Sequence, residues 1–146
     1  MGRRDYLVDG AVALAAFAVS AAIVVVAGDD PEVRSPDVFA FGLVAAHSAG
    51  VVLRRPRPIA AVVLSLATGV GYAAADYPPA LFPVVLLTVY SAAARLPERP
   101  SRLLGVAAFL VAAVTSTLGP GSTNTSVPLL VAGAWVLGNF VRARRL

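Results

Sequence analysis

The sequence contains no cysteine and no lysine, a single histidine, and few charged residues of any kind. Without cysteine there is no disulfide, no thiolate metal site and no thiol nucleophile. Phosphate-binding loops, HExxH zinc motifs, G-x-S-x-G elbows and paired catalytic carboxylates are also missing. We therefore expect no catalytic residue, no metal and no cofactor within residues 1–146.

Charged residues are also few: they make up only 14% of the chain, against about 25% in ordinary globular domains. Hydrophobic residues make up 58% of the chain, and the mean hydropathy is +0.80. Polar groups are too few to cover a water-facing surface, so lipid is the simplest solvent for this chain. All twelve basic residues are arginine, which we interpret as the base composition of a high-GC bacterium.

The abundant feature is apolar sequence, in six runs separated by short connectors rich in proline and glycine. The runs cover 7–27, 38–53, 59–75, 80–94, 103–118 and 127–141. Only helices and closed barrels satisfy every backbone group in lipid, and these runs lack the alternation of barrel strands. The pattern predicts an all-α integral membrane protein: one domain over 1–146, a bundle of about six short transmembrane helices. Five runs are shorter than the ~20 residues that cross a bilayer, so each is expected to extend into its flanks.

The first run could also be a signal peptide, because Arg3 and Arg4 precede it. Its 21 residues exceed the usual apolar core of about 7–15, and further apolar runs follow. A retained transmembrane helix is the favoured interpretation.

Arginine placement predicts the orientation. If the N-terminus is cytoplasmic and every run crosses, Arg34 alone of the twelve arginines lies outside, as the positive-inside rule requires. The formal charge of +4 could suggest nucleic acid, but the arginines lie at the ends of apolar runs, so no nucleic acid is expected. We predict a multi-pass protein of the bacterial plasma membrane with both termini inside. The predicted membrane-interface anchors are Arg54, Arg55, Arg57, Arg95, Arg142, Arg144 and Arg145.

Two polar residues inside the runs are candidates for sensing a stimulus. Because free histidine titrates near neutral pH, His47 could sense protons, or it could be a neutral hydrogen-bonding group between helices. Asn139, one turn after Trp135, could set the register of the last helix or act as a signalling pivot. Asp9, one turn after Asp5, is expected to be exposed at the interface or paired with a basic loop.

A third candidate lies around the turn that follows the third run. Tyr72, Asp76 and Tyr77 offer an acceptor, phenolic donors and aromatic faces, which could bind a small ligand or a headgroup. The alternative is an aromatic anchor beside a proline turn.

Small residues recur at four-residue spacing, a pattern that brings helix backbones together in lipid. They are Gly42, Ala46 and Gly50; Ala67, Gly71 and Ala75; and Ala134 and Gly138. These faces predict tight packing within the bundle or across a homodimer, unless they only reflect the abundance of alanine.

The stretches "LRRPRPIAAVVL", "DYPPALFPVVLLTVYSAAARLPERPSR" and "AWVLGNFVRARR" carry a resemblance that extends over nearly the whole chain. The sequence resembles the N-terminal membrane module of actinobacterial two-component sensor histidine kinases of the nitrate-sensor and thermosensor type. The resemblance implies a last helix that passes a stimulus to a cytosolic kinase, either in the same chain beyond Leu146 or on a partner. No phosphoacceptor histidine or ATP-binding motif occurs in 1–146, and His47 lies in an apolar run.

Two other classes of function remain open from the sequence. One is a small accessory or structural membrane protein that binds another through its small-residue faces. The other is a transporter or channel subunit, for which the runs supply few polar groups beyond His47, Ser65, Thr68 and Thr88.

Overall fold

Six α-helices make up the fold in the computed structural model, which describes residues 3–28, 34–77, 82–118 and 126–144. They are α1 (Arg3–Ala27), α2 (Val38–Leu53), α3 (Pro58–Ala74), α4 (Phe82–Ala93), α5 (Glu98–Leu118) and α6 (Ser126–Ala143). Each coincides with one of the six apolar runs, so the predicted all-helical class is confirmed.

Short-range sequence signals explain where the helices start and stop. The Asp37 side chain caps α2 by accepting the Ala40 N–H at 2.9 Å, and Pro58 is the first residue of α3. Pro83 is the second residue of α4, where a missing N–H costs nothing. Asp76 ends the turn after α3 with a φ of 57°, a left-handed conformation that aspartate tolerates.

The expected extension into the flanks occurs in some helices only. The helices α1, α5 and α6 reach 25, 21 and 18 residues and are long and apolar enough to cross a membrane. In the part of the chain that the structure describes, α2, α3 and α4 have 16, 17 and 12 residues. A residue in a helix rises 1.5 Å, so α2 is about 24 Å long.

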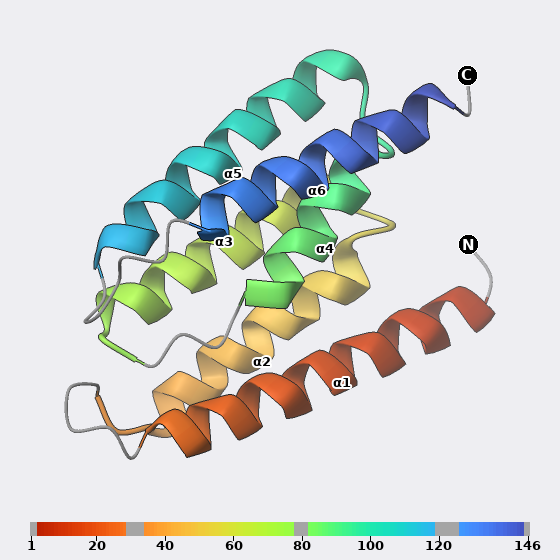
Figure 1. Ribbon diagram of the computed structural model, residues 1–146. Coiled ribbons are helices and arrows are strands. Elements are labelled where there is room, and N and C mark those ends of the chain that lie inside the picture. The colour runs from red at the N-terminus through yellow and green to blue at the C-terminus, as the bar shows by residue number, and fades with distance from the viewer. Residues whose placement is uncertain (1–2, 29–33, 78–81, 119–125, 145–146) are drawn as a thin grey trace.

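The helices run up and down, so that both chain ends lie at the same end of the bundle (Figure 1). The turns from α2 to α3 and from α4 to α5 lie at that end too (Figure 1). The closest pairs are α2 with α3 and α4 with α6, whereas α1 packs chiefly against α2 at the edge.

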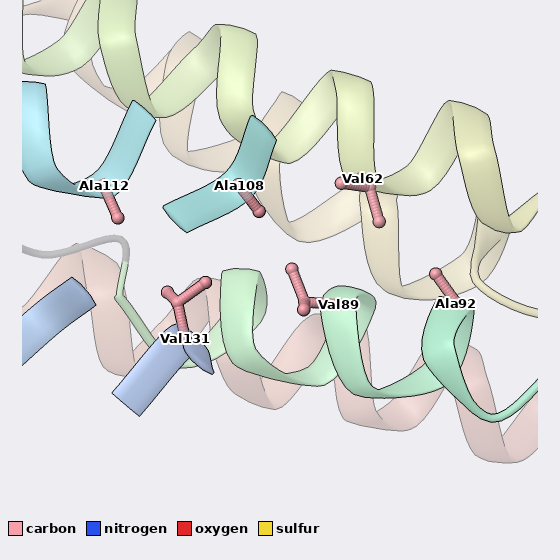
Figure 2. Packing of buried hydrophobic residues seen from close by; sticks show 6 residues of the cluster. All are labelled: Val62, Val89, Ala92, Ala108, Ala112 and Val131. Atoms are coloured by element: carbon pink, nitrogen blue, oxygen red, sulfur yellow. The ribbon is translucent and has the colours of Figure 1, made fainter. Parts of the chain in front are cut away.

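Two groups of small and branched side chains fill the interior. One joins α3, α4, α5 and α6, whose side chains point toward one another in Figure 2: Val62, Val89, Ala92, Ala108, Ala112 and Val131. The other joins α1, α2 and α3 with the turn after α3: Val24, Ala40, Val44, Tyr72 and Tyr77. Many large apolar side chains, Leu7, Leu14, Leu103 and Leu129 among them, lie on the outside, which suits a lipid environment.

Candidate functional site

Two polar clusters lie at opposite ends of the bundle and a third lies inside it. We call the first the tyrosine end: Arg34, Asp37, Tyr72, Asp76 and Tyr77. The second is the arginine end, which holds the start of α1, the end of α6 and the turns 54–57 and 94–97. Sequence analysis placed a candidate in each of the three regions.

At the tyrosine end, Asp37 is the acceptor around which the other side chains gather. The Tyr77 hydroxyl donates to its Oδ1 at 2.6 Å, and Arg34 Nη2 donates to its Oδ2 at 2.7 Å. The Arg34 guanidinium also lies over the Tyr77 ring, 4.9 Å from the centroid. The Tyr77 hydrogen bond, followed by that from Ala40 N–H, lowers the pKa of Asp37 from 3.8 to about 2.

The predicted candidates Tyr72 and Tyr77 do meet, with ring centroids 5.1 Å apart, and both are buried. Desolvation and the bond to Asp37 raise the pKa of Tyr77. The Tyr72 hydroxyl is buried without a hydrogen-bond partner among the residues that the structure describes. The Asp76 side chain is exposed, while its carbonyl accepts the Arg34 N–H at 2.9 Å.

Sequence reasoning missed the part that Asp37 and Arg34 play here. The signal that could have revealed Asp37 is its place just before an apolar run, where aspartate acts as a helix cap. Its pairing with Tyr77, forty positions away, depends on the tertiary fold.

His47 lies between α2 and α3 and is completely buried. Its Nδ1 is 2.8 Å from Thr68 Oγ1, which itself donates to the Leu64 carbonyl at 2.7 Å. Thr68 thus links the His47 ring to the backbone of α3. Within the described residues no group of His, Cys, Asp and Glu side chains could hold a metal ion.

Ser65 and Thr88 are also buried, and the Ser65 hydroxyl and the Thr88 methyl group lie close to Gly50. A Cβ at Gly50 would lie 2.7 Å from Ser65 Oγ, so the glycine leaves room for that hydroxyl. The four polar residues named for a transport path are thus buried between α2, α3 and α4.

At the arginine end, Asp9 on α1 is completely buried and faces two arginines that follow α2. Arg54 Nη2 lies 2.6 Å from its Oδ1, and Arg55 Nε lies 2.7 Å from its Oδ2. Arg55 Nη1 also reaches Asp5 Oδ1 at 2.8 Å. Of the two expectations for Asp9, pairing with a basic loop is therefore found, and exposure is not.

Further contacts tie the other segments to this end. Arg95 Nη1 donates to the Arg55 carbonyl at 3.4 Å, and Arg142 Nη1 donates to the Leu96 carbonyl at 2.7 Å. Arg144 lies over the Phe140 ring, 4.4 Å from its centroid.

The predicted anchors thus divide by environment. Arg54 and Arg55 form ion pairs with carboxylates of α1, whereas Arg57 and Arg95 are exposed. Arg142 and Arg144 flank the end of α6, and Arg145 lies outside the described residues.

Near the arginine end, α6 is fitted closely against α4 and α5. Trp135 Nε1 donates to the Ser101 carbonyl at 2.9 Å, and the ring covers Gly105, where a Cβ would come within 2.6 Å. Asn139 Nδ2 donates to the Trp135 carbonyl at 2.9 Å, and its Oδ1 accepts from Ser101 Oγ at 3.3 Å. A Cβ at Gly138 would lie 2.5 Å from the Tyr90 carbonyl oxygen.

The small residues that recur at four-residue spacing also differ in their environment. Gly50 and Gly138 lie at close helix contacts inside the bundle, whereas Gly42 and Ala67 are exposed. Packing within the bundle therefore accounts for two of the recurring positions, and pairing of two copies remains a prediction.

Comparison with known proteins gives one match. Residues 1–145 match the family described as a domain of unknown function (DUF7134). No curated protein and no solved structure matches the chain.

Proposed function

The chain belongs to the DUF7134 family, and we propose that it is a membrane-embedded signal-input module that works through α6. In this proposal the six helices cross a bacterial plasma membrane, with the arginine end in the cytoplasm. A stimulus changes the packing of the bundle, and α6 passes the change to a cytosolic histidine kinase, in cis or on a partner. The shared end of the two termini and the three helices of spanning length support this arrangement.

The observation that carries the proposal is the close fit of α6 at the arginine end. Gly138 meets the α4 backbone, and Trp135 and Asn139 are hydrogen-bonded to Ser101 in the first turn of α5. At contacts this close a displacement of one helix is passed on to its neighbour, because a close-packed interior has low compressibility. A shift of α4 or α5 therefore moves the cytosolic end of α6.

The bilayer itself is the stimulus that the helix lengths favour. At 1.5 Å per residue, α2 and α3 are about 24 and 26 Å long, against a hydrocarbon core of ~30 Å. A stimulus acts only through a difference in free energy between two packings. Bilayer thickness supplies such a difference wherever short and long helices share one bundle.

Distance measurements by electron paramagnetic resonance test the proposal, because the absence of native cysteine makes paired labels simple to introduce. We would label Arg57→Cys and Arg144→Cys, both exposed at the arginine end, in bilayers of short, medium and long acyl chains. We expect the distance between the labels to change progressively with chain length. Labels at Leu129→Cys and Arg144→Cys, both on or just after α6, serve as the control and should keep a constant distance.

An unchanged distance between positions 57 and 144 across the series would remove the support for a bilayer stimulus. A change shared by the control pair would mean that α6 itself deforms, and that it does not move as a rigid conduit.

A further inference from the structure

The arginines at the arginine end differ in whether a carboxylate neutralises them. Arg54 and Arg55 pair with Asp9 and Asp5, and Arg102 pairs with Glu98. Arg57, Arg95 and Arg99 are exposed, and no carboxylate pairs with them in the described parts of the chain. The charges of these three guanidinium groups are therefore uncompensated, as are those of Arg4, Arg142 and Arg144 elsewhere at this end in the described residues.

The fold places Arg57, Arg95 and Arg99 on one rim. Arg57 directly precedes α3 and Arg99 is the second residue of α5, and these two helices pack together and begin at the same end (Figure 1). Arg95 reaches across to the Arg55 carbonyl, which brings the turn before α5 beside the turn before α3.

Exposed apolar side chains follow directly behind the rim. On α3 these are Ile59 and Val63, and on α5 they are Leu103 and Val106. The exposed fraction of each of these residues is about one half or more. The surface therefore combines a cationic edge with an apolar wall that starts within one turn of it. That combination matches a phospholipid, whose charged headgroup and acyl chains are joined in one molecule.

We propose that Arg57, Arg95 and Arg99 form a seat for the headgroup of an anionic phospholipid, with its acyl chains along α3 and α5. Guanidinium groups bind phosphate oxygens through paired hydrogen bonds, and basic pockets at the membrane surface select anionic lipids. A nucleic acid or an acidic protein would meet the same charges but would leave the apolar wall uncovered. The seat requires residence in a bilayer and does not depend on signalling.

The single tryptophan can be moved to supply a probe for this seat. Trp135 contacts Ser101 and Gly105 on the buried face of α5, about 200° around the helix from Arg99. We would therefore combine Trp135→Phe with Leu103→Trp, because Leu103 is exposed one turn after Arg99 on the same face. We would place the whole chain in vesicles of phosphatidylcholine with a brominated phosphatidylglycerol, and compare quenching with that by brominated phosphatidylcholine. We expect stronger quenching by the anionic lipid, and a preference that weakens as salt is added.

Substitutions then show which arginines cause the preference for the anionic lipid. An arginine near the membrane surface contributes about fivefold to anionic lipid binding, so R57Q/R99Q should abolish most of the preference. R57K/R99K keeps both charges and should retain most of it. R102Q is the matched control, because Arg102 lies on the same turn of α5 but is paired with Glu98, and it should change the preference little.

Equal quenching by the two lipids in the Trp135→Phe/Leu103→Trp chain, with all arginines in place, would overturn the proposal. So would a loss in R102Q as large as that in R57Q/R99Q, since general charge attraction would then explain the effect. Helicity by circular dichroism confirms that each variant is folded. Because these outcomes report on lipid alone, their failure is separable from failure of the signalling proposal.

Discussion

A buried carboxylate between two arginines is the most consequential polar feature at the scale of single residues. Asp9 has no exposed side-chain surface, and Arg54 beside it is only 13% exposed. Taking charges out of water is costly, so removal of one member of such a group leaves the others uncompensated. This cluster also joins α1 to the rest of the bundle, since α1 packs chiefly against α2.

We therefore expect Asp9→Asn to lower the free energy of unfolding by about 3 kcal/mol. The Asp5→Asn variant is the control, because Asp5 also pairs with Arg55 but its side chain is 41% exposed, and it should cost under ~1 kcal/mol. Reversible unfolding in mixed detergent micelles measures both. Equal losses in the two variants would show that the burial of Asp9 carries no special weight.

At the tyrosine end, the pKa of Asp37 gives a prediction about pH. Its folded pKa of about 2 lies below the ordinary 3.8, so the carboxylate stabilises the fold above pH ~4, and this contribution is lost as the pH falls through 2. The hydrogen bond from Tyr77 is the largest cause of the shift, so Tyr77→Phe should raise the pKa of Asp37 toward 3.8. Tyr72→Phe should leave it unchanged, because the Tyr72 hydroxyl does not bond to Asp37.

A carbon-13 NMR titration of the Asp37 carboxyl group in the two variants measures this difference. The same low pKa in Tyr77→Phe as in the wild-type chain would contradict the assigned cause.

At the scale of elements, glycines decide how close two helices come. A Cβ at Gly138 would lie 2.5 Å from a backbone oxygen of α4 and 2.7 Å from Ala93 Cβ, and backbone cannot rotate away. We expect Gly138→Ala to separate α4 from α6 and to cost roughly 1–3 kcal/mol. On the same helix, Gly133 has open space around it, so Gly133→Ala should be neutral or should stabilise by up to ~1 kcal/mol.

Thermal unfolding of the two variants, with the α4–α6 distance from spin labels, checks this pair. Equal behaviour of the two would mean that the contact at Gly138 is not tight in the membrane.

Much of the element pattern could be read from the sequence, and the residues show why part of it could not. Six helices follow from the runs and their proline breaks, because those signals are local. Helix length was less predictable: α5 starts at Glu98, since Pro100 is tolerated in a first turn. The partners of Asp37 and Asp9 lie 40 and 45 positions away, so only the tertiary fold brings them together.

At the scale of the whole molecule, the two ends of the bundle differ in charge, and this difference predicts how the chain is oriented. Arginines from four segments meet at the end that holds both termini, whereas the described part of the other end has Arg34 already paired with Asp37. Arginine in short loops is retained in the cytoplasm. We therefore expect the tyrosine end to face outward.

Single cysteines at exposed arginines test this orientation in intact bacterial cells. A membrane-impermeant maleimide should label Arg34→Cys from outside, whereas Arg57→Cys and Arg144→Cys should react only after the cells are opened. All three arginines are at least half exposed or lie on turns, so access to the reagent depends on the side of the membrane. External labelling at position 144 but not at 57 would mean an odd number of crossings between them. The end of α6 would then be outside the cell, where it could reach no cytosolic kinase.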